Sequence, residues 1–305
     1  MNFTGLVMIL LGGLFIAFYT ILTKNIFNNV PDWKDKSGLF VSLTSFIAIL
    51  ALACLIPFTG GLELKSGWLL PAVITGILNI FIQYSIVRAK ALEEVSLVTP
   101  IYSTTPAVVI LTSIIILGEY PTFWGWVGIW LMVIGTYLLN IQDFFEKKKS
   151  GQEIKPKDYL APFLLLGKSK GVRFAFLAAF LASISLNFDA LAYRRANVAF
   201  AGVIVFGITA VFNFLYALKN KEIEGGIPKI SWKIVLTSII FCGAIWFSSA
   251  AFRYGITPYV GTLKRIYIPL VIVFAFIFLK EKIGFKNRLF GGILIAIGAT
   301  LISVA

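Results

Sequence analysis

Two stretches of the chain carry the same pattern of scarce residues. Residues 101–135 read IYSTTPAVVILTSIIILGEYPTFWGWVGIWLMVIG, and residues 264–298 read KRIYIPLVIVFAFIFLKEKIGFKNRLFGGILIAIG. A shift of 163 residues aligns one proline and two glycines of each stretch: Pro106 with Pro269, Gly128 with Gly291, and Gly135 with Gly298. Glu119 and Glu281 match after a slip of one residue. Because proline and glutamate are scarce here, these matches indicate an internal repeat.

The composition around these stretches is that of a protein that lives in lipid. Of the 305 residues, 59% are hydrophobic and 13% are charged, which leaves too few polar residues to cover a water-soluble globule. Crossing a hydrocarbon core takes roughly 20 helical residues. Apolar segments of that length recur at 5–24, 37–58, 67–88, 95–117, 122–141, 172–193, 198–218, 232–254, 258–279 and 285–304. The sequence therefore predicts an all-α integral membrane protein with ten transmembrane helices.

The repeat divides the chain into two halves. We expect a first five-helix repeat at 1–141, a basic cytoplasmic linker at 142–171 and a second five-helix repeat at 172–305. Because five is an odd number, two halves with the same internal order must cross the membrane in opposite orientations. Inverted repeats are typical of secondary transporters, in which equivalent halves open a central site to each side in turn.

The distribution of basic residues predicts the orientation. The net charge is +13, but the Lys and Arg residues gather in loops between apolar spans, a pattern of membrane topology rather than of nucleic-acid binding. Counted with the span ends that flank them, loops after odd-numbered spans hold 21 basic residues, and loops after even-numbered spans hold 4. Since short basic loops mark the cytoplasmic side, we expect both termini to face outward. A prokaryotic plasma membrane is the default location.

The proline and glycine positions also have structural consequences. Glycines seven residues apart lie on one helix face and permit close packing against a neighbouring helix. Glu119 and Glu281 lie at span ends, where we expect each to cap the helix that follows. Prolines in the fourth and ninth spans free backbone carbonyls, so these spans are either interrupted helices that line a transport site or simply kinked helices.

The repeated stretches resemble the drug/metabolite transporter superfamily, specifically its EamA-like members with ten helices and two domains. The resemblance rests on Arg88, Pro106, Leu117-Gly118-Glu119, Gly128 and Gly135, and on their echo Arg253, Pro269, Leu279-Lys280-Glu281, Gly291 and Gly298. The second copy departs from the first in having Lys280 where Gly118 stands. The resemblance implies transport but fixes no substrate, since the family covers exporters of amino acids and drugs as well as sugar-phosphate and nucleotide-sugar exchangers.

Three charged residues lie well inside predicted spans, away from the span ends: Asp189, Lys264 and Arg265. Because a charge in lipid is costly, such residues imply a polar cavity or a partner. We expect Lys264 and Arg265 to bind an anionic group of the substrate, and they look like the adjacent Lys and Arg with which triose-phosphate translocators of the same superfamily hold phosphate. A structural ion pair and snorkelling to the interface are the alternatives. Asp189 is expected to pair with them or to couple transport to a proton.

Polar and aromatic residues elsewhere complete the predicted substrate site. Asn79 and Gln83 lie one turn apart on the same helix face, and Tyr102 and Trp246 are further candidates for the wall. The chain has no histidine, and it lacks a cysteine pair at zinc spacing, a phosphate-cradling loop and a nucleophile elbow. We therefore expect no enzyme activity, no catalytic residue, no metal and no cofactor.

These features together predict a secondary active transporter that works by alternating access. Its partners are the lipid bilayer and a small metabolite with a negative group, such as an amino acid, an organic acid or a phosphorylated metabolite. A proton or a counter-substrate is the candidate coupling partner, and the oligomeric state stays open. An exporter of neutral or cationic compounds is the alternative, followed by a non-transporting membrane scaffold.

Overall fold

A computed structural model describes residues 1–33, 36–92, 101, 104–148, 159–164, 166–224, 226–279 and 285–305. The longer helices are α1 (Phe3–Asn29), α2 (Ser37–Leu55), α3 (Leu69–Leu92), α5 (Thr105–Leu117), α6 (Phe123–Lys148), α8 (Lys170–Arg195), α9 (Val198–Lys219), α10 (Trp232–Ala250), α12 (Tyr267–Leu279) and α13 (Phe285–Val304). Shorter elements are α7 (Ala161–Leu164), α11 (Thr257–Leu263) and the 3-10 helices η1 (Pro31–Trp33), η2 (Ile56–Thr59), η4 (Ala251–Arg253) and η5 (Lys264–Ile266). The described part of the chain contains no named strand.

Most of these helices match the predicted spans. Six are long and apolar enough to cross a membrane: Phe3–Thr23, Ser37–Thr59, Leu69–Ile86, Lys170–Arg195, Val198–Lys219 and Trp232–Arg253. Three apolar helices are shorter: Thr105–Leu117, Phe123–Leu139 and Phe290–Val304. The predicted span 258–279 is divided into α11, η5 and α12. The all-α membrane fold expected from composition is confirmed.

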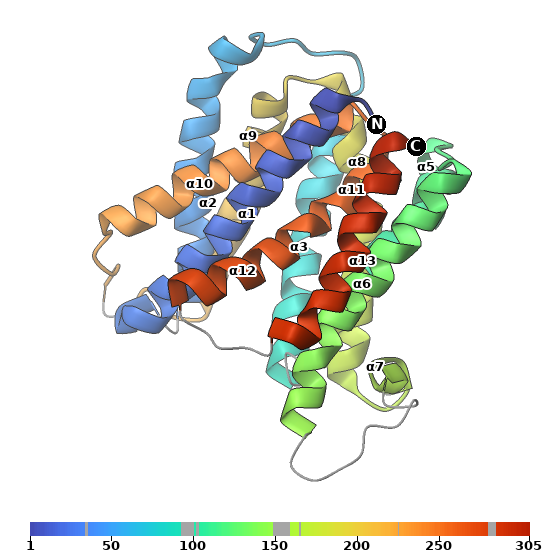
Figure 1. Cartoon of the computed structure of the whole chain (residues 1–305). Coiled ribbons are helices and arrows are strands. Elements are labelled where there is room, and N and C mark those ends of the chain that lie inside the picture. The colour runs from blue at the N-terminus through green and yellow to red at the C-terminus, as the bar shows by residue number, and fades with distance from the viewer. Residues whose placement is uncertain are drawn as a thin grey trace.

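In its largest contacts, each half packs a helix antiparallel to a helix of the other half. Figure 1 shows the helices of the two halves side by side. Thr75 of α3 bonds to Ser185 of α8, and nearer the far end of the same pair Tyr84 packs against Phe174. Under the repeat shift, α1 corresponds to α8 and α3 corresponds to α10. The equivalent of the α3–α8 contact is therefore the contact between α10 and α1, which is also present. The remaining large contacts join equivalent helices, α2 with α9 and α6 with α13. This exchange of partners is what two inverted five-helix repeats require.

The repeated glycines lie where α6 and α13 cross. A methyl group on Gly128 would lie 2.7 Å from the carbonyl oxygen of Gly298, and one on Gly135 would lie 2.7 Å from that of Gly291. No side chain fits at that distance, so the backbones approach closely only because all four residues are glycine. The predicted packing role of these glycines is confirmed. Each of the two helices packs against its equivalent in the other half.

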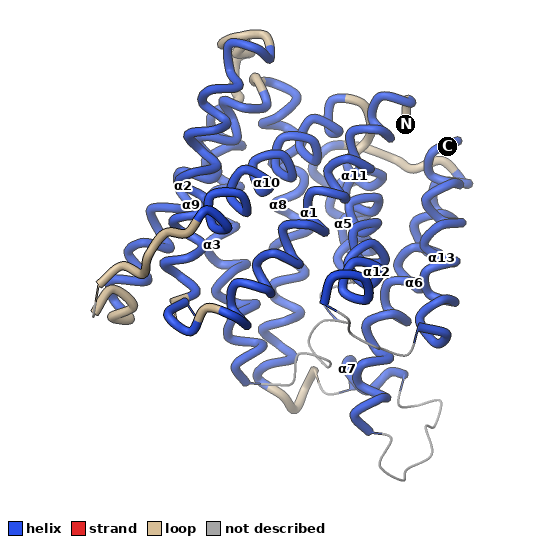
Figure 2. Tube along the Cα trace, turned by 60° about the vertical axis from the view of Figure 1, so that its left-hand side comes forward, coloured by secondary structure: helices blue, strands red, loops and turns tan. Residues whose placement is uncertain are grey.

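Both chain ends lie at one end of the bundle, and α7 lies at the other (Figures 1 and 2). We call these ends the termini face and the linker face. Between the halves, α6 continues to Lys148 and α8 begins at Lys170, so helix covers the first part of the predicted linker 142–171. The limits of the two repeats and of the linker stay a prediction.

Candidate functional site

The break in the ninth span positions its two basic residues. Lys264 and Arg265 form η5 between α11 and α12, and both are partly buried. Pro258 stands in the first turn of α11, and Pro269, in the first turn of α12, has no N–H to donate to the carbonyl four residues earlier. The α-helix of this span is interrupted by a three-residue 3-10 turn that holds the Lys-Arg pair, while the backbone stays helical throughout. Whether the span lines a transport site or is simply kinked stays a prediction.

Asp189 faces the same region from α8. One carboxylate oxygen accepts a hydrogen bond of 2.7 Å from the Thr75 hydroxyl of α3, which also lies 2.6 Å from the Ser185 hydroxyl. Thr75 is fully buried, whereas Asp189 is partly exposed. Within the described residues the second carboxylate oxygen has no hydrogen-bond partner, so it is available to a ligand.

Lys264 is an opposite charge that acts on this carboxylate. Asp189 and Lys264 act on each other electrostatically, and Lys264 is also within electrostatic reach of Arg265. Among ion pairs of the described chain, none joins Asp189 to Lys264 within 4.0 Å. The Lys264 ammonium instead lies 4.4 Å from the centre of the Phe252 ring. The structure thus brings the three predicted charges together without joining Asp189 and Lys264 by direct contact.

Aromatic side chains border this charged group. The Tyr193 hydroxyl shares a hydrogen bond with the Ser249 side chain, and the Tyr193 ring lies parallel to Phe252 with centroids 6.4 Å apart. Trp246 of α10 packs edge-on to Phe247, and its indole nitrogen is buried without a partner in the described chain. Because a buried N–H without a partner is costly, Trp246 is a candidate donor to a bound ligand.

Of the predicted pair Asn79 and Gln83, the structure places Gln83 at another cavity. Gln83 accepts a hydrogen bond of 3.0 Å from Asn213 of α9 and lines a separate cavity of ≈ 220 Å³ between α2, α3 and α9. Asn79 lies one turn away on α3 and is partly buried. Their role in substrate binding stays a prediction. Tyr102 falls outside the described residues.

Glu119 has a different role from the one expected. It does not cap the following helix α6. The Thr122 hydroxyl takes that place, because it accepts the N–H of Gly125 in the first turn of α6. One Glu119 oxygen instead accepts the N–H of Thr257, at the start of α11, over 2.6 Å. The expected cap is therefore wrong in its target, since Glu119 caps a helix of the other half.

Arg194 completes this connection between the halves, and the sequence analysis missed it. Its guanidinium forms a salt bridge with Glu119 and donates to the carbonyl oxygens of Phe252 at 2.6 Å and Gly255 at 2.7 Å. We call this the Glu119–Arg194 bridge. A signal was present, because basic residues are scarce in the loops after even-numbered spans, but nothing in the local sequence indicated the partner.

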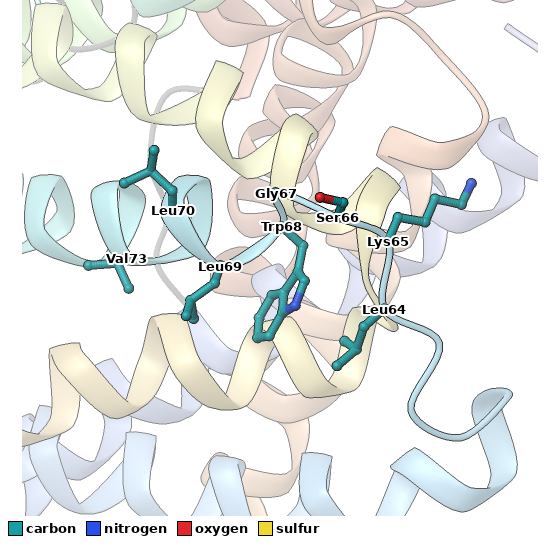
Figure 3. A pocket seen from close by; sticks show the side chains of 8 residues that line it. All are labelled: Leu64, Lys65, Ser66, Gly67, Trp68, Leu69, Leu70 and Val73. Carbon is teal, nitrogen blue, oxygen red and sulfur yellow. The ribbon is translucent and has the colours of Figure 1, made fainter.

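A second cavity lies beside the α2–α3 loop, apart from the charged group of Asp189, Lys264 and Arg265 (Figure 3). It measures ≈ 620 Å³ and is lined by Leu64, Lys65, Ser66, Gly67, Trp68, Leu69, Leu70 and Val73. Its lining is largely apolar, and the Lys65 side chain extends away from Trp68 and Leu69. Such a surface suits a lipid chain better than a polar solute.

Comparison with known proteins places this arrangement in a family. The sequence profile of the EamA-like transporter family matches residues 3–141. The match covers slightly less than half of the chain. The predicted resemblance is confirmed over these residues, whose matching family is one of transporters, and the apolar helices make the chain a multi-pass membrane protein.

A solved structure extends the likeness to the whole chain. Its title reads only "Crystal structure of protein", and it is 16% identical, with a TM-score of 0.72 over 100% of this chain and 98% of that one. At this identity the likeness shows the fold alone, and it covers both repeats. No curated protein matches the sequence significantly.

Proposed function

We propose that this EamA-like protein is a secondary active transporter that moves a small metabolite with a negative group by alternating access. The observation that carries the proposal is the position of Lys264 and Arg265 at the interruption of the ninth span, facing Asp189. An interrupted helix exposes backbone polar groups inside a membrane protein, which is tolerated where it lines a binding site. Two adjacent cations there favour a carboxylate or phosphate group.

The charges at the site favour one class of anionic substrate over the others. Asp189 supplies a negative pole with an available oxygen, and Lys264 and Arg265 supply a positive pole. An amino acid carries a carboxylate and an ammonium group and would satisfy both poles. An organic acid or a phosphorylated metabolite would use the basic pair alone and leave Asp189 to bind a coupling proton. The amino acid is therefore the substrate that the site supports best.

The packing of the halves supports alternating access. Contacts between halves exchange under the repeat shift, so two equivalent arrangements of the bundle are available. The Glu119–Arg194 bridge joins the halves at the termini face and holds the start of α11, which leads directly to η5. Opening of the termini face would have to break this bridge. Substrate that binds at η5 would shift the equilibrium between the bridged and the open state, because α11 connects η5 to the bridge. A prokaryotic plasma membrane and a proton or counter-substrate complete the proposal.

An exporter of neutral or cationic compounds is the second candidate. It is favoured by Asp189 and by the aromatic group of Tyr193, Trp246 and Phe252, which would suit an organic cation. In that case Lys264 would serve as the counter-charge that substrate displaces. A membrane scaffold without transport would have no use for these partly buried charges.

The test is a ligand screen on the purified protein. Melting temperatures are measured with anionic, zwitterionic and cationic metabolites for the wild type, for Lys264→Ala/Arg265→Ala and for the matched control Lys229→Ala/Lys233→Ala. The control removes two exposed lysines far along the chain from η5. A ligand at 100 times its dissociation constant adds about 2.7 kcal/mol of stability. We expect amino acids to stabilise the wild type and the control but not the η5 variant.

Hits from the screen are then tested for uptake into liposomes. Stabilisation by cations alone, unchanged in the η5 variant, would establish the second candidate instead. If no metabolite class distinguishes the variants, and liposomes take up none of them, the transport site is not at η5.

A further inference from the structure

The termini face carries only four basic residues in its loops, and all four come together. They are Lys65 after the second span, Arg194 and Arg195 after the sixth, and Arg253 after the eighth. These residues line one open cavity of ≈ 520 Å³ together with Glu63 and Leu64. We call this cavity the basic pocket. If these residues were merely scattered over the surface, three separate loops would not deliver all of them to one cavity.

The rim of the basic pocket is fixed by backbone hydrogen bonds. The main-chain N–H of Lys65 donates to the carbonyl of Arg195 over 2.7 Å, and that of Asn197 donates to the carbonyl of Glu63 over 2.9 Å. The Asn197 side chain donates to the carbonyl of Thr59 over 2.8 Å. The loop of the first half is thus joined to the α8–α9 turn of the second half, and the charged side chains project from a rigid frame.

Two of the arginines are held by carbonyl oxygens rather than by carboxylates. Arg253 donates from Nε to the carbonyl of Tyr193 at 2.9 Å and from Nη2 to that of Ala196 at 2.5 Å. These neutral acceptors fix the guanidinium but leave its charge and its Nη1 group available. Arg195 donates one weak hydrogen bond, to Gly67 at 3.3 Å, and is exposed.

The pocket also has an excess of positive charge. Arg194 is balanced by Glu119, whereas Glu63 makes no ion pair within 4.0 Å in the described part of the chain. Lys65, Arg195 and Arg253 therefore face one acid. Cationic groups held this close repel one another, and an anion that bonds to several of them relieves the repulsion. Guanidinium groups fixed in place lose little entropy when they bind a planar or tetrahedral oxyanion.

We propose that the basic pocket is a second anion-binding site, separate from η5, that takes a carboxylate or phosphate group at the termini face. The group belongs either to a small solute or to the headgroup of an anionic lipid. The pocket adjoins the central site through Tyr193 and Phe252, whose carbonyls hold Arg253 and Arg194 and whose rings stack on each other. The Phe252 ring in turn lies 4.4 Å from the Lys264 ammonium. The proposal does not require that the transported substrate be anionic.

The test uses inorganic phosphate and lipid nanodiscs with the purified full chain. Melting temperature is titrated with phosphate, at ionic strength matched with potassium chloride, in neutral phosphatidylcholine nanodiscs. The variant is Lys65→Gln/Arg195→Gln, which keeps the rim hydrogen bonds because they are main-chain bonds. The controls are Lys229→Gln/Lys233→Gln, with the same loss of charge, and Lys264→Ala/Arg265→Ala, which keeps the pocket. A second arm replaces part of the lipid with phosphatidylglycerol and omits phosphate.

A free anion in the pocket predicts that phosphate stabilises the wild type and both controls, and that its apparent affinity falls about tenfold in the pocket variant, since a charged hydrogen bond is lost. A lipid headgroup predicts instead that phosphatidylglycerol, not phosphate, stabilises every form except the pocket variant. The proposal is overturned if the pocket variant behaves like the Lys229/Lys233 control in both arms. Should the double variant not fold, the single Lys65→Gln and Arg195→Gln variants answer the same question. Loss of response in the η5 variant alone would bear on the proposed function and not on this pocket.

Discussion

The α3–α8 contact and the α1–α10 contact are equivalent under the repeat, yet their chemistry differs. In the first, Thr75 bonds to both Ser185 and Asp189. In the second, Phe15 stacks with Phe247 at 5.4 Å and Tyr19 with Phe241 at 4.7 Å. The same antiparallel helix crossing thus supports a hydrogen-bonded polar contact in one place and an aromatic contact in the other.

The difference teaches that inverted symmetry constrains backbone packing and leaves chemistry free. Close backbone approach depends on small residues, such as Gly12 against Ser248, and these can recur in each repeat without a functional demand. A binding site needs unlike charges in one place, and here α8, of the polar contact, supplies Asp189 opposite η5. We therefore expect substitutions at α3–α8 to impair function and those at α1–α10 to impair stability.

The largest effect is expected for Asp189→Asn. Removing one of two opposite charges that act on each other within the bundle leaves the other less compensated, which lowers stability. The melting temperature should fall, and uptake of the ligand found by screening should be lost. The double variant Asp189→Asn/Lys264→Met should recover most of the stability but none of the uptake. Asp32→Asn, at an exposed position, serves as the control. Normal uptake by the double variant would show that the charges serve only stability.

The next largest effect is expected for Gly12→Ala in α1. The added methyl group would lie 2.9 Å from the backbone nitrogen of Ser248, so the helices must separate, at a cost of about 1–3 kcal/mol. The opposite sign is expected for Gly207→Ala in α9, where nothing lies within 4 Å and alanine favours helix. Melting temperatures in detergent compare the two. Equal shifts would mean that α1 and α10 do not approach as closely as described.

A smaller effect is expected for Thr75→Val in the polar contact. The change keeps the shape but removes the hydroxyl that donates to Asp189, which costs about 1 kcal/mol or somewhat more. Uptake should fall more than stability, because the carboxylate loses its orientation. The control is Thr209→Val, since the buried Thr209 hydroxyl bonds only to the carbonyl of Val205 in its own helix. A similar loss of uptake in both variants would contradict a role of Thr75 in positioning the Asp189 carboxylate.

The smallest effect is expected for Phe247→Leu in the aromatic contact. Ring stacking with Phe15 adds about 0.5–1.5 kcal/mol beyond burial, so the melting temperature should fall slightly. The half-saturation concentration for uptake should stay unchanged, since Phe247 does not take part in the Asp189–Lys264 group. A changed half-saturation concentration with unchanged stability would assign function to both contacts.

Some residues of the candidate site could be predicted from the sequence, and others could not. It singled out Asp189, Lys264 and Arg265 because each is a charge within an apolar span, a local signal. It also grouped Gln83 with the site, whereas Gln83 bonds to Asn213 in a different cavity. Polar side chains at helical spacing indicate a shared face but do not say which neighbour that face meets. Arg194 was missed for the same reason, since its partner Glu119 is 75 residues away.

The sequence by itself determined that this is an all-helical membrane protein built from an internal repeat. Apolar length and composition act on each segment separately, and the matching Pro, Gly and Glu positions are visible without any contact being known. Only the tertiary structure decided which helices adjoin, that Glu119 caps α11 of the other half, and that four scattered basic residues line one pocket. These outcomes depend on long-range packing between the halves, because residues far apart in the chain become neighbours only when the inverted repeats come together.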